Sequence, residues 1–238
     1  MQTAKNRYTE YMTEYIDAHC HYVAQPPVGA VCGFVYNSAR ASDWAVAIAA
    51  HGPGAYATIG IHPWYVADVP PDWGAQMERL LCENPGLMIG EIGLDASRGD
   101  VMGQMPIFVR QIEMANRFGR VAHIHCVRAW DKMLRVFAGA KMRQPVVFHG
   151  FNGNSEIVAS LLRHSDAYFS FGPRVAPRAA SGVPVERVLV ESDADAPNVA
   201  CEILPRITEQ IAEFYGLAPT DACKIIYDNT TRILENGR

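Results

Sequence analysis

The segment Tyr15-Ile-Asp-Ala-His19-Cys-His21 joins a short apolar run to two histidines that stand two residues apart at its carboxyl end. Residues two apart in an extended strand point to the same face, so both imidazoles face one side. Two imidazoles on one face can chelate one metal ion. The segment therefore predicts a β-strand that carries metal ligands.

Eight β-rich runs of this kind recur along the chain, and most gaps between them carry helical periodicity. The predicted strands span Tyr15–His19, Val31–Tyr36, Ala55–Ile61, Leu87–Ile92, Val121–His125, Pro145–Phe148, Ala167–Phe171 and Val188–Glu191. A typical helical gap places Phe108, Ile112 and Ala115 on one face ahead of Gly119. Alternating strands and helices predict a parallel sheet, and eight strands favour closure into a (β/α)8 TIM barrel of the α/β class.

Two parts of the chain depart from a regular barrel. The gap over residues 20–30 contains Pro26, Pro27 and Gly29 and is too short for a helix, so the first crossover helix is expected to be missing or shortened. Two further helical patterns follow the eighth run, one from about Pro205 to Gly216 and one opened by Thr220. We expect these extra C-terminal helices to pack on the outer wall.

Length and composition favour an ordinary globular enzyme. At 238 residues the chain has a size at which α/β barrels form one unit, so we expect an N-terminal extension over residues 1–14 and one hydrolase barrel over 15–238. Residues Thr9–Glu14 are hypothesised to form a helix that covers exposed strands. A net charge of -4 provides no basic field for polyanions, so a nucleic-acid substrate would depend on local contacts or on metal ions.

Targeting signals and cysteine usage point to the cytoplasm. The first fourteen residues lack the apolar core of a signal peptide, and no apolar run approaches the roughly 20 residues needed to span a bilayer. The six cysteines form no Cys-X-X-Cys pair, which favours a reducing compartment. No membrane association is expected.

Histidines and acids collect where the predicted strands end, which is where barrels of this kind build their sites. These ends read Gly60-Ile-His62-Pro63, Gly90-Glu91-Ile-Gly93-Leu-Asp95, His123-Ile-His125, Phe148-His149 and Glu191-Ser-Asp193. A single histidine near an apolar strand is more often a hydrogen-bonded structural residue than a ligand. Their joint placement at one rim is improbable by chance, so we interpret them as one site.

Four imidazoles and two carboxylates exceed what one tetrahedral ion requires, which predicts two divalent metal ions with a shared ligand. Glu91 is the expected bridge, because a carboxylate can bind two cations through its two oxygens. The two predicted ligand groups are His19, His21, Glu91 and Asp193 on one ion, and Glu91, His125 and His149 on the other. This donor set suits Zn²⁺ or Mn²⁺ better than Mg²⁺, although supplied Mg²⁺ often supports such chemistry.

Six ordered motifs resemble those of the TatD family of metal-dependent deoxyribonucleases. They are Asp17-Ala-His19-Cys-His21, Gly60-Ile-His62-Pro63, Gly90-Glu91-Ile-Gly93-Leu-Asp95, Ile124-His125-Cys126, Phe148-His149-Gly-Phe-Asn152-Gly153 and Glu191-Ser-Asp193-Ala. The resemblance covers residues 15 to 235. It implies an amidohydrolase-type barrel, a divalent-metal site carrying the ligands named above, and hydrolysis of DNA phosphodiester bonds, often from the 3′ end.

The chain also departs from that family's pattern. The family usually has an arginine directly after the His-Cys pair, whereas this chain has Val127 there and Arg128 one place later. The connection from Gly172 to Glu186 is short, and Asp195 adds an acid. These changes concern substrate contacts rather than metal binding. Together with the acidic net charge they favour a short, single-stranded or terminal substrate, and DNA, RNA and aminoacyl-tRNA ends all stay open.

The expected mechanism is hydrolysis by a metal-activated hydroxide. Asp193 would orient this hydroxide and accept its proton, and Glu91 would hold the two ions together. His62 is a candidate to bind the phosphate or protonate the leaving oxygen. Its alternative role is structural, as a histidine fixed by the turn before Pro63.

Other rim residues are weaker candidates for substrate binding, each with a structural alternative. Asp95 could line the mouth or form a turn, Asn152 could present backbone amides to phosphate or cap the next helix, and Arg128 could meet a phosphate or be solvated. His123 is expected to be a core or supporting residue behind His125.

Two other functions compete with a deoxyribonuclease. A small-molecule amidohydrolase could cleave an amide, ester or lactone on the same metal platform, and fold alone does not exclude it. Many such relatives bridge their metals with a carboxylated lysine, whereas this chain has Glu91 and no lysine at a predicted strand end. A non-catalytic scaffold is disfavoured because every predicted ligand is present.

Overall fold

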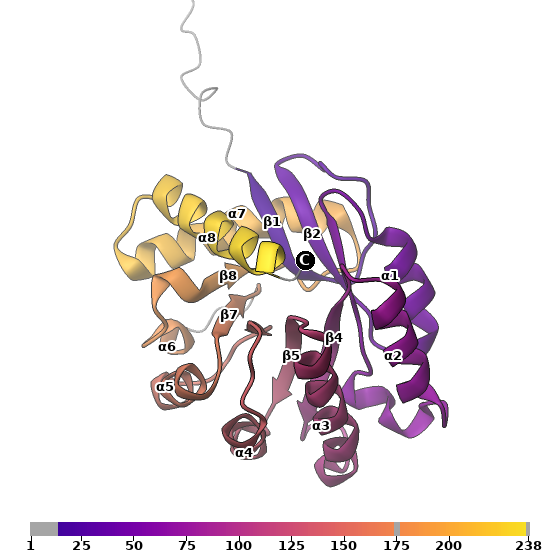
Figure 1. The fold of residues 1–238 in the computed structure, drawn as a ribbon. Coiled ribbons are helices and arrows are strands. Elements are labelled where there is room, and N and C mark those ends of the chain that lie inside the picture. The colour runs from indigo at the N-terminus through magenta and orange to yellow at the C-terminus, as the bar shows by residue number, and fades with distance from the viewer. Residues whose placement is uncertain (1–13, 174–176, 237–238) are drawn as a thin grey trace, which may run out of the picture.

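Eight strands form one sheet in the order β1 to β8 in the computed structural model, which describes residues 14–173 and 177–236 (Figure 1). The strands are β1 Tyr15–Cys20, β2 Val31–Asn37, β3 Ala55–Ile59, β4 Met88–Asp95, β5 Ala122–Val127, β6 Val146–Phe148, β7 Ala167–Phe171 and β8 Val188–Val190. Each strand pairs in parallel with the next. The predicted (β/α)8 barrel is confirmed.

Helices surround the ring of strands on its outside (Figure 1). They are α1 Trp44–Ala50, α2 Trp73–Glu83, α3 Val101–Phe118, α4 Trp130–Ala140, α5 Ser155–His164, α6 Pro177–Ala180, α7 Pro197–Tyr215 and α8 Pro219–Asn236. Three 3-10 segments are η1 Ala41–Asp43, η2 Pro63–Asp68 and η3 Val185–Arg187. Within the described ranges, no helix combines the length and apolarity that crossing a membrane requires.

The barrel is nearly closed where β1 meets the segment after β8. The His21 amide donates to the Ala194 carbonyl at 2.9 Å, and the Asp193 amide donates to the His19 carbonyl at 3.0 Å. These two bonds lie at the carboxyl ends of the strands. They bring His19 and His21 beside Asp193, which is 172 or more positions away in the sequence.

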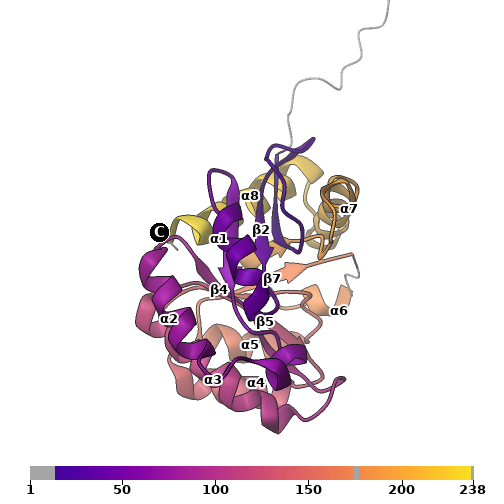
Figure 2. The ribbon, with the colours of Figure 1, turned by 90° about the vertical axis from the view of Figure 1, so that its right-hand side faces the viewer.

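The first crossover has no helix, as predicted, and α8 contacts the strands that this leaves uncovered. Ile233 and Leu234 of α8 pack with Ile16 and Ala18 of β1 in one buried cluster. The other buried members come from strands around the ring: Val35, Met88, Val121, Val147, Tyr168 and Leu189. The end of α8 lies near the centre of the ring in Figure 1 and on one face of the molecule in Figure 2. We infer that α8 closes the end of the barrel opposite the mouth, whereas the sequence led us to expect it on the outer wall.

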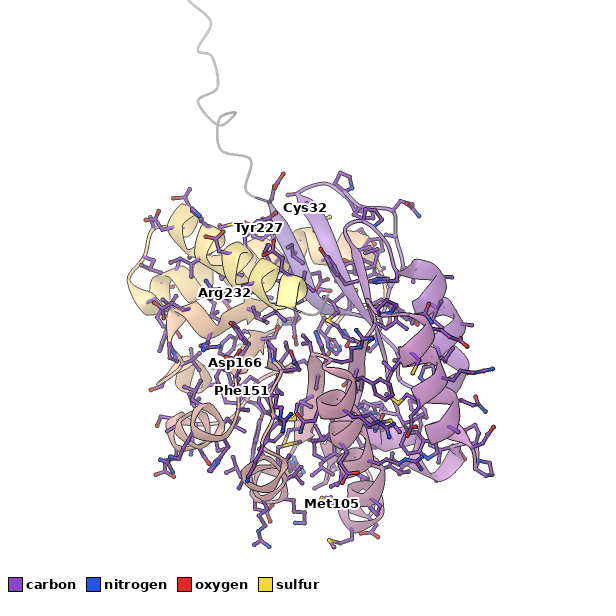
Figure 3. All side chains as sticks on the ribbon, in the orientation of Figure 1. Cys32, Met105, Phe151, Asp166, Tyr227 and Arg232 are labelled. Carbon is purple, nitrogen blue, oxygen red and sulfur yellow. The ribbon has the colours of Figure 1, made fainter. Side chains whose placement is uncertain are left out.

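Side chains of α8 also pack beside β2. Tyr227 of α8 and Cys32 of β2 both pack against the same cluster, and Figure 3 labels the two residues near each other. The hypothesised cover by Thr9–Glu14 lies outside the described residues except for Glu14. The expected division at residue 14 therefore stays a proposal.

One predicted helix begins earlier than expected. The sequence pattern placed its start at about Pro205, but α7 begins at Pro197 and holds Pro205 in its interior. Proline suits the first turn of a helix because its missing N–H needs no partner there, and Pro197 takes that position. The predicted end is confirmed, because Gly216 is the left-handed C-cap with φ 65°.

Close backbone approach between β4 and β5 requires glycine at position 93. Gly93 has φ 152°, and a Cβ added there would lie 1.9 Å from the His125 carbonyl oxygen. We expect Gly93→Ala to lower the free energy of unfolding by about 3 kcal/mol or more, because the strands must separate. Urea denaturation checks this result, with Gly139→Ala in α4 as control. Nothing lies within 4 Å of a Cβ at Gly139, so the control should keep or gain stability.

Candidate metal centre

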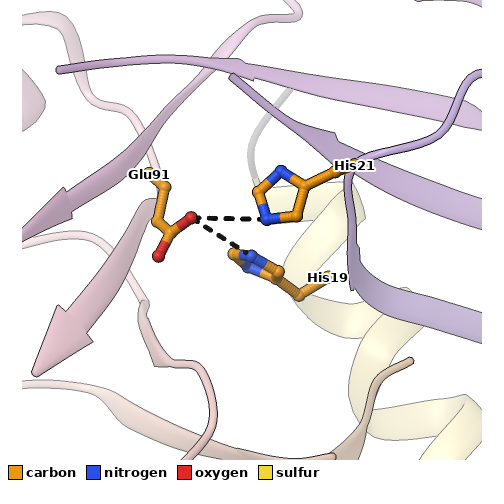
Figure 4. Close-up of side chains that lie close together, drawn as sticks. All are labelled: His19, His21 and Glu91. Atoms are coloured by element: carbon orange, nitrogen blue, oxygen red, sulfur yellow. Dashed lines mark ion pairs between the residues drawn. The ribbon is translucent and has the colours of Figure 1, made fainter. Parts of the chain in front are cut away.

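The six predicted ligands converge at the mouth of the barrel, with the Glu91 carboxylate in their middle. Its Oε2 lies 3.5 Å from His19 Nε2 and 3.6 Å from His21 Nε2 (Figure 4). Its Oε1 lies 2.9 Å from His125 Nδ1 and 2.7 Å from His149 Nε2. The two oxygens of one carboxylate thus face two separate pairs of imidazoles, as the sequence predicts for a bridging ligand.

Asp193 completes the first of these groups from the solvent side. Its Oδ1 lies 3.4 Å from His21 Nε2 and 3.9 Å from His19 Nε2. The Asp193 side chain is 49% exposed, whereas that of Glu91 is only 4% exposed. Asp193 also has φ 50°, a backbone conformation that non-glycine residues adopt rarely and that clusters at functional sites. A carboxylate at this position can meet both a metal ion and a water molecule.

Local irregularities in two strands aim the central groups into the barrel. The pairing register shifts between Asp17 and Cys20 in β1 and between Ile89 and Ile92 in β4. Such bulges redirect side chains and often lie next to active sites. The shift in β4 includes Glu91, so this carboxylate lies deep in the strand, whereas His149 and Asp193 follow the ends of β6 and β8.

Three of the four imidazoles have a polar partner near the ring nitrogen that faces away from Glu91, and for His21 and His125 this contact is a hydrogen bond. His21 Nδ1 lies 2.9 Å from the Asn37 carbonyl, and His125 Nε2 lies 3.2 Å from Asp95 Oδ2. His149 Nδ1 lies 3.4 Å from Glu191 Oε1. Partners of this kind fix the tautomer and orientation of metal-binding histidines.

Sequence reasoning missed Glu191 as a functional residue. It is fully buried, and its Oε1 accepts the Gly150 amide at 2.7 Å as well as facing His149. The available signal was its position two residues before Asp193, which places a second carboxylate at the same strand end. We interpret Glu191 as the group that holds the His149 ring in place.

Asp17 was also missed, and it joins the two edges of the barrel. It is fully buried, and it accepts hydrogen bonds from Ser192 N at 2.8 Å and Ser192 Oγ at 2.5 Å. Burial raises the pKa of Asp17 to about 7, against the lowering effect of these Ser192 bonds. The Asp17–Ser192 contact fixes the loop that carries Asp193 against the strand that carries His19.

The electrostatics of the centre favour a cation at Glu91. Burial alone would raise the pKa of this carboxyl, but the charges of His149 and His62 hold it well below its usual range. Burial and the neighbouring His149 lower the pKa of His19, so its ring is held neutral. A buried carboxylate beside a neutral imidazole is a suitable donor set for a divalent ion.

Unpartnered buried atoms support the same interpretation. Both ring nitrogens of His19 are buried without a hydrogen-bond partner in the described part of the chain. Such atoms are costly unless something satisfies them, and a metal ion at Nε2 would do so for that nitrogen. Ligand atoms of His19, His21 and Glu91 lie within 4.8 Å of one another, as do those of His62, Glu91 and His125, and those of His19, His149 and Asp193. The residues present therefore fit divalent metal.

His62 lies closer to the centre than the sequence predicted. Its Nε2 is 3.3 Å from Glu91 Oε1, while its Nδ1 accepts the Trp64 amide at 3.1 Å. Because Nδ1 accepts, the neutral ring carries its proton on Nε2, which faces Glu91. One nitrogen of His62 caps η2, as the structural alternative expects, and the other faces the predicted site, where a catalytic role stays a prediction.

The weaker substrate candidates lie in different surroundings. Asp95 does not line the mouth: it is 1% exposed, because Ser97, Trp64 and His125 all engage its carboxylate. Asn152 is exposed beside the site, and Asn154 is the residue that caps α5, so the capping alternative for Asn152 is wrong. Arg128 is exposed with φ 52°. His123 is buried behind the centre as expected.

Two hollows adjoin the metal centre. One has a volume of 520 Å³ and is lined by Trp64, Tyr65 and Asp195 together with His21, His62, Glu91 and Asp193 of the centre. The other has a volume of 690 Å³ and is lined by Phe151, Asn152, Phe171 and Pro173 together with His125, His149 and Asp193. An extended ligand placed across the centre could therefore occupy both sides.

Removal of metal is expected to lower thermal stability. A ligand present at 100 to 1,000 times its Kd stabilises the folded state by about 3 to 4 kcal/mol, which for a chain of this size corresponds to about 5 to 15 °C in Tm. Calorimetry before and after EDTA treatment measures the change, and added Zn²⁺ or Mn²⁺ should restore it. An unchanged Tm after verified loss of metal would contradict the fit.

Comparisons with known proteins agree with this geometry. A family model described as TatD-related DNase matches residues 16–235. An uncharacterized metal-dependent hydrolase of Mycoplasma genitalium is 29% identical over 211 residues, which cover 76% of this chain and 80% of that protein. A protein of Erwinia billingiae named 3′-5′ ssDNA/RNA exonuclease TatD is 28% identical over 208 residues, covering 77% of this chain and 79% of that protein.

Solved structures show the same fold. A TatD homologue from Escherichia coli superimposes with a TM-score of 0.79 at 20% identity and covers 94% of this chain and 98% of that one. A TatD-family hydrolase from Entamoeba histolytica has a TM-score of 0.75 at 14% identity and covers 92% of this chain and 97% of that one.

Proposed function

Because this chain belongs to the family of TatD-related DNases and is a metal-dependent hydrolase, we propose that it cleaves phosphodiester bonds of DNA. The preferred substrates are short or single-stranded 3′ ends, from which it removes nucleotides in the 3′ to 5′ direction. The observation that supports this proposal most is the Glu91 carboxylate, whose two oxygens face two separate pairs of imidazoles.

The proposed ligands form two groups that share Glu91. His19, His21 and Asp193 would hold one ion with Glu91, and His125 and His149 would hold the other with it. Zn²⁺, Mn²⁺ or Mg²⁺ bound there would supply positive charge for the phosphate oxygens and lower the pKa of a water molecule. Glu191 and Asp95 keep the rings of His149 and His125 in their orientations.

Asp193 is the proposed general base. Burial would raise the pKa of its carboxyl, but the hydrogen bond from His21 lowers it, so the group is ionised at neutral pH. It is half exposed at the mouth and can therefore orient an incoming water molecule and accept its proton. His62 is the proposed donor on the opposite side of Glu91, where its Nε2–H can reach a phosphate or leaving oxygen.

Charge favours a small or terminal substrate. The chain carries a net charge of -4, and the hollow beside the centre is lined by Asp43, Asp193 and Asp195. A long duplex would bring many phosphates against this acidic rim. A relative named for ssDNA and RNA exonuclease activity supports the same preference.

Oligonucleotides labelled at one end test this proposal against the amidohydrolase alternative. Metal-loaded protein should shorten a 5′-labelled single strand in one-nucleotide steps, and blocking the 3′ end should stop it. RNA of the same sequence measures sugar preference. Hydrolysis of aryl esters or lactones without any cleavage of oligonucleotides would instead support the small-molecule amidohydrolase.

A further inference from the structure

Two exposed arginines lie on two adjacent aromatic residues beside the metal centre. The guanidinium carbon of Arg98 is 4.4 Å from the centre of the Trp64 ring, and that of Arg40 is 4.0 Å from the centre of the Tyr65 ring. Arg40 follows β2, the aromatic residues begin η2 after β3, and Arg98 follows β4. All three segments leave the carboxyl ends of neighbouring strands, so the arginines stand on the rim of the mouth.

The aromatic residues under these arginines are tied to the centre. Trp64 Nε1 donates to Asp95 Oδ2 at 2.7 Å, and the same oxygen lies 3.2 Å from His125 Nε2. Trp64 and Tyr65 both line the 520 Å³ hollow that contains Glu91 and Asp193. The two guanidinium groups thus lie over rings that line the hollow beside the bond that the site would hydrolyse.

Both guanidinium groups are available to an anion. Arg98 forms no ion pair with any residue that the structure describes, and Arg40 has only an exposed contact of 4.0 Å with Asp43. Asp43 already accepts the backbone amides of Ala39 and Arg40. A guanidinium that lies on a ring keeps its N–H donors free along its edge, and this planar fork matches phosphate oxygens.

We propose that Arg40 and Arg98 bind phosphates on the 5′ side of the bond being hydrolysed, so that a single nucleic-acid strand crosses the rim above η2. This inference rests on the proposed function. The ligand is phosphate rather than a base because each guanidinium covers a face of the ring on which a base would stack. In an acidic rim these two groups supply the local positive charge that a polyanion needs. Arg128, a weak phosphate-binding candidate from the sequence, has no ring beneath it among the described residues.

Substrates with different numbers of phosphates separate this role from catalysis. We expect Arg40→Gln and Arg98→Gln each to raise KM for a single-stranded pentathymidylate about two- to tenfold. The salt dependence of log(kcat/KM) should become shallower by about 0.7 per arginine. The kcat for the pentanucleotide, and both constants for the dinucleotide TpT, whose single phosphate is the one hydrolysed, should stay unchanged.

Arg163→Gln is the matched control. Arg163 is exposed in the last turn of α5, and the helices of the barrel run away from the mouth, so this variant should match the wild type in every constant. A pentanucleotide with uncharged methylphosphonates beside the scissile bond gives a second test. The wild type should bind it more weakly than the unmodified pentanucleotide. The double variant Arg40→Gln/Arg98→Gln should bind the two pentanucleotides with the same affinity.

Three results would overturn the inference. The first is an unchanged KM and salt slope in both variants, and the second is an equal loss of kcat/KM on TpT and on the pentanucleotide. The third is weaker binding of the methylphosphonate pentanucleotide than of the unmodified one by the double variant. Failure of the proposed function is a different result, in which the wild type cleaves no oligonucleotide. Fluorescence anisotropy of a labelled pentathymidylate with metal-loaded protein then tests whether the arginines bind phosphates. Weaker binding by the variants than by the wild type supports this role, and absence of binding by the wild type rules it out.

Discussion

Glu91→Gln is expected to lower kcat/KM on oligonucleotides by at least about a thousandfold and to reduce bound metal. The charge that metal ions supply to such a transition state is worth several kcal/mol, and each 1.4 kcal/mol is a factor of about ten. Glutamine keeps the shape of the side chain but removes the negative charge that both groups of imidazoles share. At least one ion should then bind too weakly to be retained.

Kinetic assays and elemental analysis of the same preparation measure both effects. Glu209→Gln, which changes an exposed glutamate of α7, is the control and should match the wild type. Circular dichroism establishes that each variant is folded. Full metal content together with wild-type rates in Glu91→Gln would mean that this carboxylate does not bridge ions.

Asp193→Asn is expected to lower kcat by about 10²- to 10⁴-fold while most of the metal is retained. General-base catalysis contributes rate factors of this order. The asparagine oxygen can still face His21 and the neighbouring ion, but the amide cannot accept a proton at neutral pH. The combination of lost turnover and retained metal distinguishes this residue from Glu91.

Single-turnover rates and metal content at several pH values test this second prediction. Asp228→Asn, on the exposed side of α8, serves as the control. If Asp193→Asn loses metal in proportion to its activity, Asp193 acts as a ligand alone. If it retains more than about a tenth of the wild-type kcat, the general base lies elsewhere.

Most of the fold could be predicted because its signals are local. Each strand is an apolar run bounded by turn residues, and the short first gap with Pro26 and Pro27 excluded a helix without any knowledge of packing. Pro205 misled the prediction of α7, since a proline marks helix starts on average but is tolerated inside a helix that the core holds in place. The cover provided by α8 depends on contacts across more than 200 residues and has no local signal.

Part of the candidate site could likewise be predicted from local signals, and part could not. The proposed ligands share strand ends, and the geometry of a barrel brings strand ends together wherever they stand in the sequence. The supporting contacts cross between strands: Asp17 reaches Ser192, and Asp95 reaches Trp64 and His125. Nothing in the spacing of these residues indicates such pairs. The positions of the rim arginines are the hardest to predict from the sequence, because they depend on contacts between loops. Arg40, for example, lies over Tyr65 of another loop.

Anomalous diffraction from crystals of the metal-loaded protein tests the central claim most directly, because it locates bound ions without reference to activity. Data collected at the absorption edge of zinc or manganese should show two peaks on opposite sides of the Glu91 carboxylate. One peak should be within ligand distance of His19 and His21, and the other within ligand distance of His125 and His149, at about 2.0 to 2.3 Å. The absence of any peak in contact with Glu91, in protein that hydrolyses DNA with the same metal, would contradict the account.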